Sequence, residues 1–125
     1  MLEPLLYPST IDKPQVILDP QNNIFEIAGK SYPADVNFFY RPILNWFEKY
    51  AEDPNPETLF VMKMDYFNSS SAKKIVEIII ILSEIYKAGN NVKIIWHYQD
   101  HDETIQELGE DLKQQLDVPI ELMAD

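Results

Sequence analysis

The sequence predicts an α/β domain in which helices cover a mixed β-sheet. Three segments carry apolar side chains at helical spacing, and short runs of β-branched and aromatic residues alternate with them. Strands that alternate with helices favour a largely parallel or mixed sheet. The chain has 125 residues, which is enough for one domain and too few for two. We therefore expect residues 1–125 to form a single domain in the order β-β-α-β-α-β-α, with one further strand over residues 118–122 that Pro119 would place at an edge.

The first half of the chain predicts a hairpin followed by a helix. Prolines interrupt residues 1–14, which are expected to form an irregular lead-in. Residues 16–18 and 24–28 are predicted strands, and turn-forming residues lie between them. The first helix is expected over residues 32–50. Pro42 lies inside its apolar pattern and should kink or divide it, because the proline ring clashes with the preceding turn.

The second half alternates strand and helix more regularly. Residues 59–67 are apolar on both strand faces, which is typical of a central strand covered on both sides. Residues 69–88 keep helical spacing over four turns, and Gly89 suits a left-handed stop just after the helix. Residues 92–98 are the next predicted strand, and a last helix is expected to begin near Asp102.

Composition and charge exclude several function classes. The chain has 10 Lys and Arg against 21 Asp and Glu, a net charge of −11, so we expect no binding to nucleic acid or to anionic membranes. The absence of cysteine excludes disulfide scaffolds, thiolate metal sites and a cysteine nucleophile. The three glycines lie far apart, so no glycine-rich phosphate loop is present. With no signal peptide and no apolar run that could span a bilayer, we expect a cytoplasmic protein without a cofactor.

Three consecutive serines mark the most informative segment, at the junction of strand 59–67 and the following helix. Ser69, Ser70 and Ser71 stand where backbone N–H groups lack intrahelical partners, and such a helix N-terminus accommodates an oxyanion. A phosphate here would bring about −1.5 to −2 charges, and Lys73 and Lys74, one turn on, could pair with it. An ordinary serine N-cap explains the same residues. Both interpretations stay open, since one serine can cap the helix while another accepts phosphate.

Histidine supplies a second and weaker candidate site. His97 and His101 are the only histidines, and Asp100, Asp102 and Glu103 lie beside them as candidate metal ligands. Since one histidine is expected on a strand and the other on a loop, they lack the geometry of two histidines one turn apart on a helix. A small metal-dependent hydrolase remains only as a weaker alternative. A half-buried strand histidine beside a solvated loop explains the same residues.

The run Tyr66-Phe67-Asn68-Ser69-Ser70-Ser71-Ala72-Lys73 is the most specific of several segments that together resemble the SiaC family of bacterial regulatory phosphoproteins. It is accompanied, in the same order as in the family, by residues 31–36, 39–46, 92–98 and 102–110. The resemblance extends over most of the chain, from residue 10 to residue 122.

The resemblance implies both a fold and a switch. Family members resemble the STAS fold of anti-sigma-factor antagonists, which is a mixed sheet with covering helices. A serine/threonine protein kinase phosphorylates a hydroxyl at the start of the second helix, and a PP2C-type phosphatase removes the phosphate. The unphosphorylated form binds and activates a diguanylate cyclase, which raises cyclic di-GMP and favours biofilm formation or aggregation.

The family pattern transfers to particular residues of this sequence. The family's phosphoacceptor directly follows the Phe-Asn pair and is therefore Ser69, with Ser70 and Ser71 as less favoured positions. Asn68 and Ser70 would shape the loop and contact phosphate or partner, and Lys73 would stabilise the phosphate. The chain is then a regulatory protein rather than an enzyme. The alternative partner-switching function is that of a STAS-like antagonist of an anti-sigma kinase.

Overall fold

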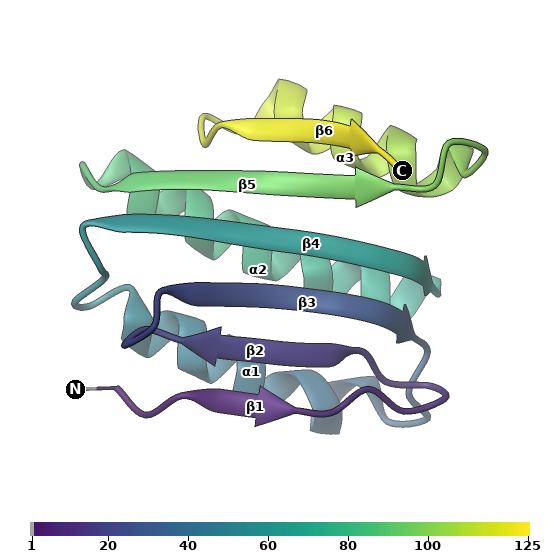
Figure 1. Cartoon of the computed structure of the whole chain (residues 1–125), viewed down its shortest axis with the longest axis horizontal. Helices are drawn as coiled ribbons and strands as arrows, with labels where there is room; N and C mark the ends of the chain where they lie inside the picture. The colour runs from purple at the N-terminus through teal and green to yellow at the C-terminus, as the bar shows by residue number, and fades with distance from the viewer. Residues whose placement is uncertain (1) are drawn as a thin grey trace.

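A computed structural model describes residues 2–125 as a six-stranded sheet with all three helices on one of its faces (Figure 1). The strands lie side by side in chain order: β1 (Leu5–Tyr7), β2 (Gln15–Asp19), β3 (Ile24–Ser31), β4 (Glu57–Phe67), β5 (Asn91–Tyr98) and β6 (Ile120–Ala124). The first three pair antiparallel, and β3 to β6 pair parallel. Three helices form the crossovers: α1 (Val36–Tyr50), α2 (Ser69–Lys87) and α3 (Glu103–Gln115). The expected mixed α/β fold is confirmed.

The single helical layer corrects the expectation that strand 59–67 is covered on both sides. From β3 onward each new strand is added on the same side of the sheet, so right-handed crossovers place every helix on one face. Side chains of β4 consequently alternate: Phe60 and Met62 are buried under the helices, whereas Leu59 is 47% exposed on the open face. The apolar residues on the second face of β4 therefore lie on the open side of the sheet rather than under helices.

The strand β1 replaces the irregular lead-in expected over residues 1–14. Leu5–Tyr7 pairs antiparallel with β2, with Leu6 opposite Ile17. Pro4 and Pro8 lie directly on either side of the strand. Because proline cannot donate to a sheet ladder, these residues fit a very short strand at an edge of the sheet.

Side-chain caps set the helix starts. Asp35, Asn68 and Asp102 cap α1, α2 and α3, and each accepts the backbone N–H three residues on. The first helix therefore begins at Val36 rather than at residue 32. Gly89 follows α2 with φ +106°, as the sequence predicts for a left-handed stop.

The helix α1 is continuous from Val36 to Tyr50, so of the two effects expected of Pro42, a kink or a division, the division is wrong. The proline lies on the exposed face of the helix. A carbonyl that loses its intrahelical donor can be hydrated there, which limits the cost of the proline. Within residues 2–125, none of the helices has the length and apolarity needed to cross a bilayer.

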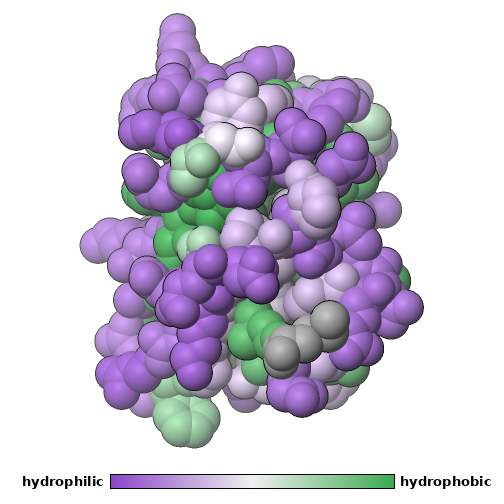
Figure 2. Space-filling model, turned by 90° about the vertical axis from the view of Figure 1, so that its left-hand side faces the viewer, coloured by the Kyte–Doolittle hydropathy of each residue, from purple (hydrophilic) through white to green (hydrophobic). Residues whose placement is uncertain are grey.

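Because β3 to β6 run parallel, their carboxyl ends line one side of the sheet and their amino ends line the opposite side. The carboxyl ends of β3, β4 and β5 and the N-termini of all three helices lie together, at the right of Figure 1. We call this the carboxyl edge. The opposite edge, which faces the viewer in Figure 2, is mostly hydrophilic, with apolar side chains in small patches. In open α/β sheets ligands favour the carboxyl edge, which here also carries the three serines.

The packing of α3 on the sheet predicts one large effect on stability. A Cβ atom built at Gly109 would lie 2.5 Å from Cδ1 and Nε1 of Trp96, which is fully buried. We expect Gly109→Ala to lower the free energy of unfolding by about 1–3 kcal/mol, seen as a lower urea midpoint. Gln114→Ala, at an exposed position of the same helix, should change it by less than about 0.5 kcal/mol. Equal midpoints for the two variants would contradict this packing.

Candidate functional site

Asn68 holds the N-terminus of α2 at the carboxyl edge. Its side-chain Oδ1 accepts the N–H of Ser71 at 2.9 Å, and its backbone N–H donates to the carbonyl of Ser31 at 3.1 Å. The strands β3 and β4 and the helix α2 therefore meet at this residue. The interpretation of the serines as N-cap is wrong, because asparagine occupies the cap position.

The three serines of the first turn have different surroundings. Ser69 and Ser70 are exposed, whereas Ser71 is completely buried. The Oγ of Ser71 accepts a hydrogen bond from the Oγ of Ser31 at 2.8 Å. A protein kinase must reach the hydroxyl that it modifies, and the hydroxyl of Ser71 is not reachable in the folded chain. Exposure thus leaves Ser69 and Ser70 as candidate phosphoacceptors.

A buried hydroxyl cluster, formed by Ser31, Tyr40 and Ser71, lies beneath this turn. The hydroxyl oxygens of Ser31 and Tyr40 are 2.6 Å apart, so the cluster joins β3, α1 and α2. Burial raises the pKa of Tyr40, and its hydrogen bonds to Ser31 and Ser71 lower it by less. Tyr40 therefore remains a neutral phenol, and the cluster fixes the first turn of α2 without any buried charge.

Cations and free backbone donors surround the exposed serines. The amides of Ser69 and Ser70 have no acceptor in the described part of the chain, as is usual at a helix start. Lys73 is exposed one turn after Ser69 and forms no ion pair with residues 2–125. Lys74 is already partly balanced, because its Nζ lies 3.4 Å from Oε2 of Glu77. An anion on Ser69 would therefore meet the positive end of α2 and one uncompensated lysine.

The histidines and acidic residues of the metal hypothesis are divided among separate roles. His97 lies on β5 with Nδ1 3.0 Å from Oδ1 of Asp125, at the C-terminal end of the chain. Asp102 caps α3, and His101 lies in the exposed turn before it. Within residues 2–125, no three His, Asp or Glu side chains are grouped as metal ligands.

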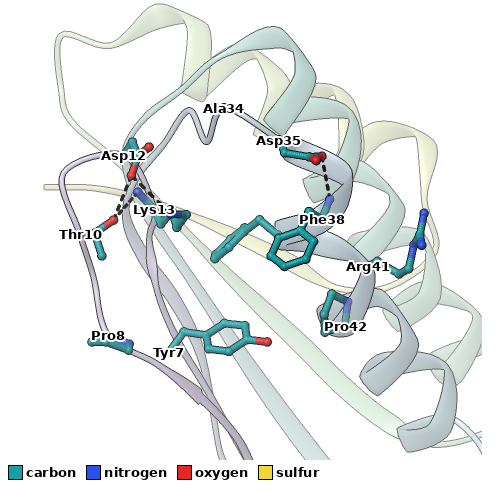
Figure 3. Close-up of a pocket in the computed structure, with 11 residues that line it drawn as sticks. Tyr7, Pro8, Thr10, Asp12, Lys13, Ala34, Asp35, Phe38, Arg41 and Pro42 are labelled. Atoms are coloured by element: carbon teal, nitrogen blue, oxygen red, sulfur yellow. Dashed lines mark hydrogen bonds and ion pairs between the residues drawn. The ribbon is translucent and has the colours of Figure 1, made fainter.

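A hollow of about 690 Å³ lies between the N-terminal segment and the start of α1 (Figure 3). We call it the N-terminal hollow. Its apolar lining comprises Tyr7, Pro8, Ala34, Phe38, Phe39 and Pro42. Phe38 is 79% exposed, which is unusual for so large an apolar side chain. Sequence patterns missed this hollow, since part of its wall comes from residues 7–13, which lie in a segment where no regular structure is expected.

An exposed aromatic pair is the second feature that sequence patterns missed. Tyr32 and Tyr66 lie edge to face with ring centroids 5.9 Å apart, and both are partly exposed. The register of β3 and β4 brings the two rings together. It places Lys30 opposite Tyr66 at the carboxyl edge, and Tyr32 directly follows the end of β3. Exposed tyrosines of this kind are frequent anchors in protein interfaces.

Comparison with known proteins gives one consistent result. The model of the family described as SiaC family regulatory phosphoprotein matches residues 7–125. An uncharacterized protein of Pseudomonas aeruginosa (strain UCBPP-PA14) is 26% identical over 117 residues, which covers 94% of this chain and 93% of that protein.

Solved structures agree with the family match. The crystal structure of apo-SiaC from Pseudomonas aeruginosa has a TM-score of 0.86 and 26% identity, and the match covers 98% of this chain and 99% of that one. SiaC in complex with the diguanylate cyclase SiaD, whose activator it is, has a TM-score of 0.88 and 26% identity, covering 97% and 99%.

Proposed function

Because the chain belongs to the SiaC family of regulatory phosphoproteins, we propose that its unphosphorylated form binds and activates a diguanylate cyclase. The relative solved with SiaD is described as the activator of that cyclase, and it shares this fold over nearly the whole chain. The protein would then raise cyclic di-GMP by contact alone, as a regulatory subunit and not as an enzyme. A cytoplasmic location suits this role, since the cyclase consumes GTP.

Phosphorylation of Ser69 is the proposed switch, with a serine/threonine kinase adding the phosphate and a PP2C-type phosphatase removing it. The observation that carries this proposal is the exposure of Ser69 at the first position of α2, above a rigidly held turn. Ser70 is also exposed, but Ser69 directly follows the Phe-Asn pair and lies one turn before Lys73. Asn68 shapes the loop that presents Ser69, and Lys73 would balance part of the phosphate charge.

The physical basis of the switch is a change of one surface rather than of the fold. A phosphate adds about −1.5 to −2 charges and three strong acceptors where the unmodified surface is a neutral hydroxyl. The positive end of α2 stabilises that charge by about 0.3–1 kcal/mol, so the modified turn keeps its structure. A partner that covers Ser69 must strip water from the phosphate, and this cost excludes the partner.

A reconstituted cyclase assay tests this function. Purified unphosphorylated protein is titrated into a purified diguanylate cyclase from the same organism, and cyclic di-GMP formation is measured. We expect a saturable rise in rate, with Ser69→Ala as effective as the wild type because the switch needs only the absence of phosphate. A rate that stays at its basal value while the two proteins are shown to be folded would refute the proposed function.

A further inference from the structure

We propose that the cyclase docks through an acidic amphipathic segment, whose apolar side chains enter the N-terminal hollow and whose carboxylates meet a row of cations leading to Ser69. This inference rests on the proposed function and specifies the surface and the chemistry of the partner. We call the cations Arg41, Lys74 and Lys73 the cation row.

The N-terminal hollow has the chemistry of an anchor site. Figure 3 shows Phe38 of α1 and Tyr7 of β1 facing the same space, with Pro8 and Pro42 beside them. Exposed apolar side chains grouped in this way mark interaction surfaces on soluble proteins. The volume of about 690 Å³ accommodates several apolar side chains, such as those that an amphipathic helix presents at i, i+3 and i+4.

The cation row connects this hollow to the N-terminus of α2. Arg41 lines the N-terminal hollow and also a smaller hollow of about 160 Å³, which Lys74 lines from α2. Lys73 precedes Lys74 and lies one turn from Ser69. In a chain with only 10 Lys and Arg against 21 Asp and Glu, this is a local concentration of positive charge.

Among residues 2–125, Lys74 is the one member of the cation row with an ion pair, to Glu77, and the two carboxylates that line the N-terminal hollow are bound to other groups. Asp35 accepts the N–H of Phe38 at 3.0 Å as the cap of α1. Asp12 accepts the Thr10 hydroxyl at 3.1 Å and lies 4.0 Å from Lys13. Arg41, in contrast, forms no ion pair with any residue between 2 and 125. Charge complementarity therefore selects carboxylates on the partner.

The proposed switch, in which phosphate on Ser69 prevents cyclase binding, also favours an acidic partner segment. A phosphate on Ser69 would pair with Lys73, shorten the cation row and repel carboxylates that approach it. A basic partner segment would instead be drawn to the phosphorylated form, because the phosphate adds negative charge to the surface that it approaches. An acidic segment is the partner that one phosphate can exclude.

Two matched pairs of variants test the docking surface by titration calorimetry of unphosphorylated protein with the cyclase. Arg41→Glu is compared with Lys49→Glu, which makes the same charge change in the last turn of α1. Phe38→Ala is compared with Ile80→Ala, an exposed apolar residue of α2. We expect Arg41→Glu and Phe38→Ala each to weaken binding at least about tenfold, and both controls to stay within about twofold.

Salt dependence and the phosphomimetic variant separate the outcomes. Wild-type affinity should fall as salt rises, with a flatter dependence for Arg41→Glu. If Arg41→Glu and Phe38→Ala bind like the wild type while Ser69→Asp loses binding, the docking surface is wrong and the proposed function stands. Tighter binding by Arg41→Glu would overturn the acidic partner. A wild-type chain that does not bind the cyclase at all would overturn both proposals.

Discussion

Phosphorylation of Ser69 is expected to weaken binding to the cyclase by about a hundredfold or more, which corresponds to about 2.8 kcal/mol. The reason is the burial of a hydrated phosphate together with its repulsion of the partner's carboxylates. The measurement is calorimetric titration of the cyclase with protein that carries phosphoserine at position 69 in full occupancy. Ser69→Asp brings a single charge and fewer oxygens, so it should weaken binding less, by about tenfold. Ser69→Ala should bind like the wild type.

Phosphoserine at position 70 is the matched control for this effect. It adds the same group one residue along α2, where the helix turns the side chain by about 100°. We expect a smaller loss of affinity, because the modified side chain lies one turn before Lys74, which Glu77 already partly balances, and not before the unpaired Lys73. Equal losses at positions 69 and 70 would show that charge at this end of α2 matters and that the particular serine does not.

Truncation of Tyr40 is expected to have the largest effect on stability among residues near the site. Tyr40→Ala should lower the free energy of unfolding by about 3–5 kcal/mol, as for other large aromatic side chains in cores. Its ring is completely buried and packs edge to face with Phe39 at 4.9 Å between centroids. Tyr40→Phe removes only the hydroxyl from the buried cluster and should cost about 1–3 kcal/mol. Chemical denaturation of the two variants separates packing from hydrogen bonding.

The pH dependence of stability provides the control for the role of the hydroxyl. Burial raises the pKa of Tyr40 above its ordinary value of 10.0. Above that pH the unfolded chain releases the proton while the folded chain keeps it, so the free energy of unfolding falls as pH rises. Tyr40→Phe should lose less stability than the wild type on going from about pH 9 to about pH 11. Parallel pH profiles for the two proteins would contradict this environment for Tyr40.

Local patterns in the sequence identify most of the fold. Helical spacing places the three helices, and the strands that flank them are correctly expected, whereas the caps of α1 and α2 are not identified from the sequence. The strand β1 has only three residues between two prolines, so it is too short to show a periodic pattern. It forms through antiparallel pairing with β2. Local sequence also does not show that one face of β4 is exposed, since this depends on the direction in which the crossovers add strands to the sheet.

The site is only partly contained in local sequence. The run Asn68-Ser69-Ser70-Ser71 offers several side chains able to cap, and only the structure shows that Asn68 does so. Tertiary packing buries Ser71 against Ser31, forty residues away in the chain. Phe38 could have been identified from the sequence, because it lies outside the apolar stripe that Phe39, Ile43 and Phe47 form on α1. A large aromatic residue outside such a stripe is a candidate contact surface.

Phosphosite mapping by tandem mass spectrometry, on protein isolated from its native host in several growth conditions, tests the phosphorylation switch most directly. The peptide spanning Tyr66 to Lys74 contains all three serines. We predict phosphate on Ser69, in a fraction that changes with growth condition, and none on the buried Ser71. A fully covered but unmodified peptide in every condition, or phosphate confined to Ser70, would contradict the switch at Ser69.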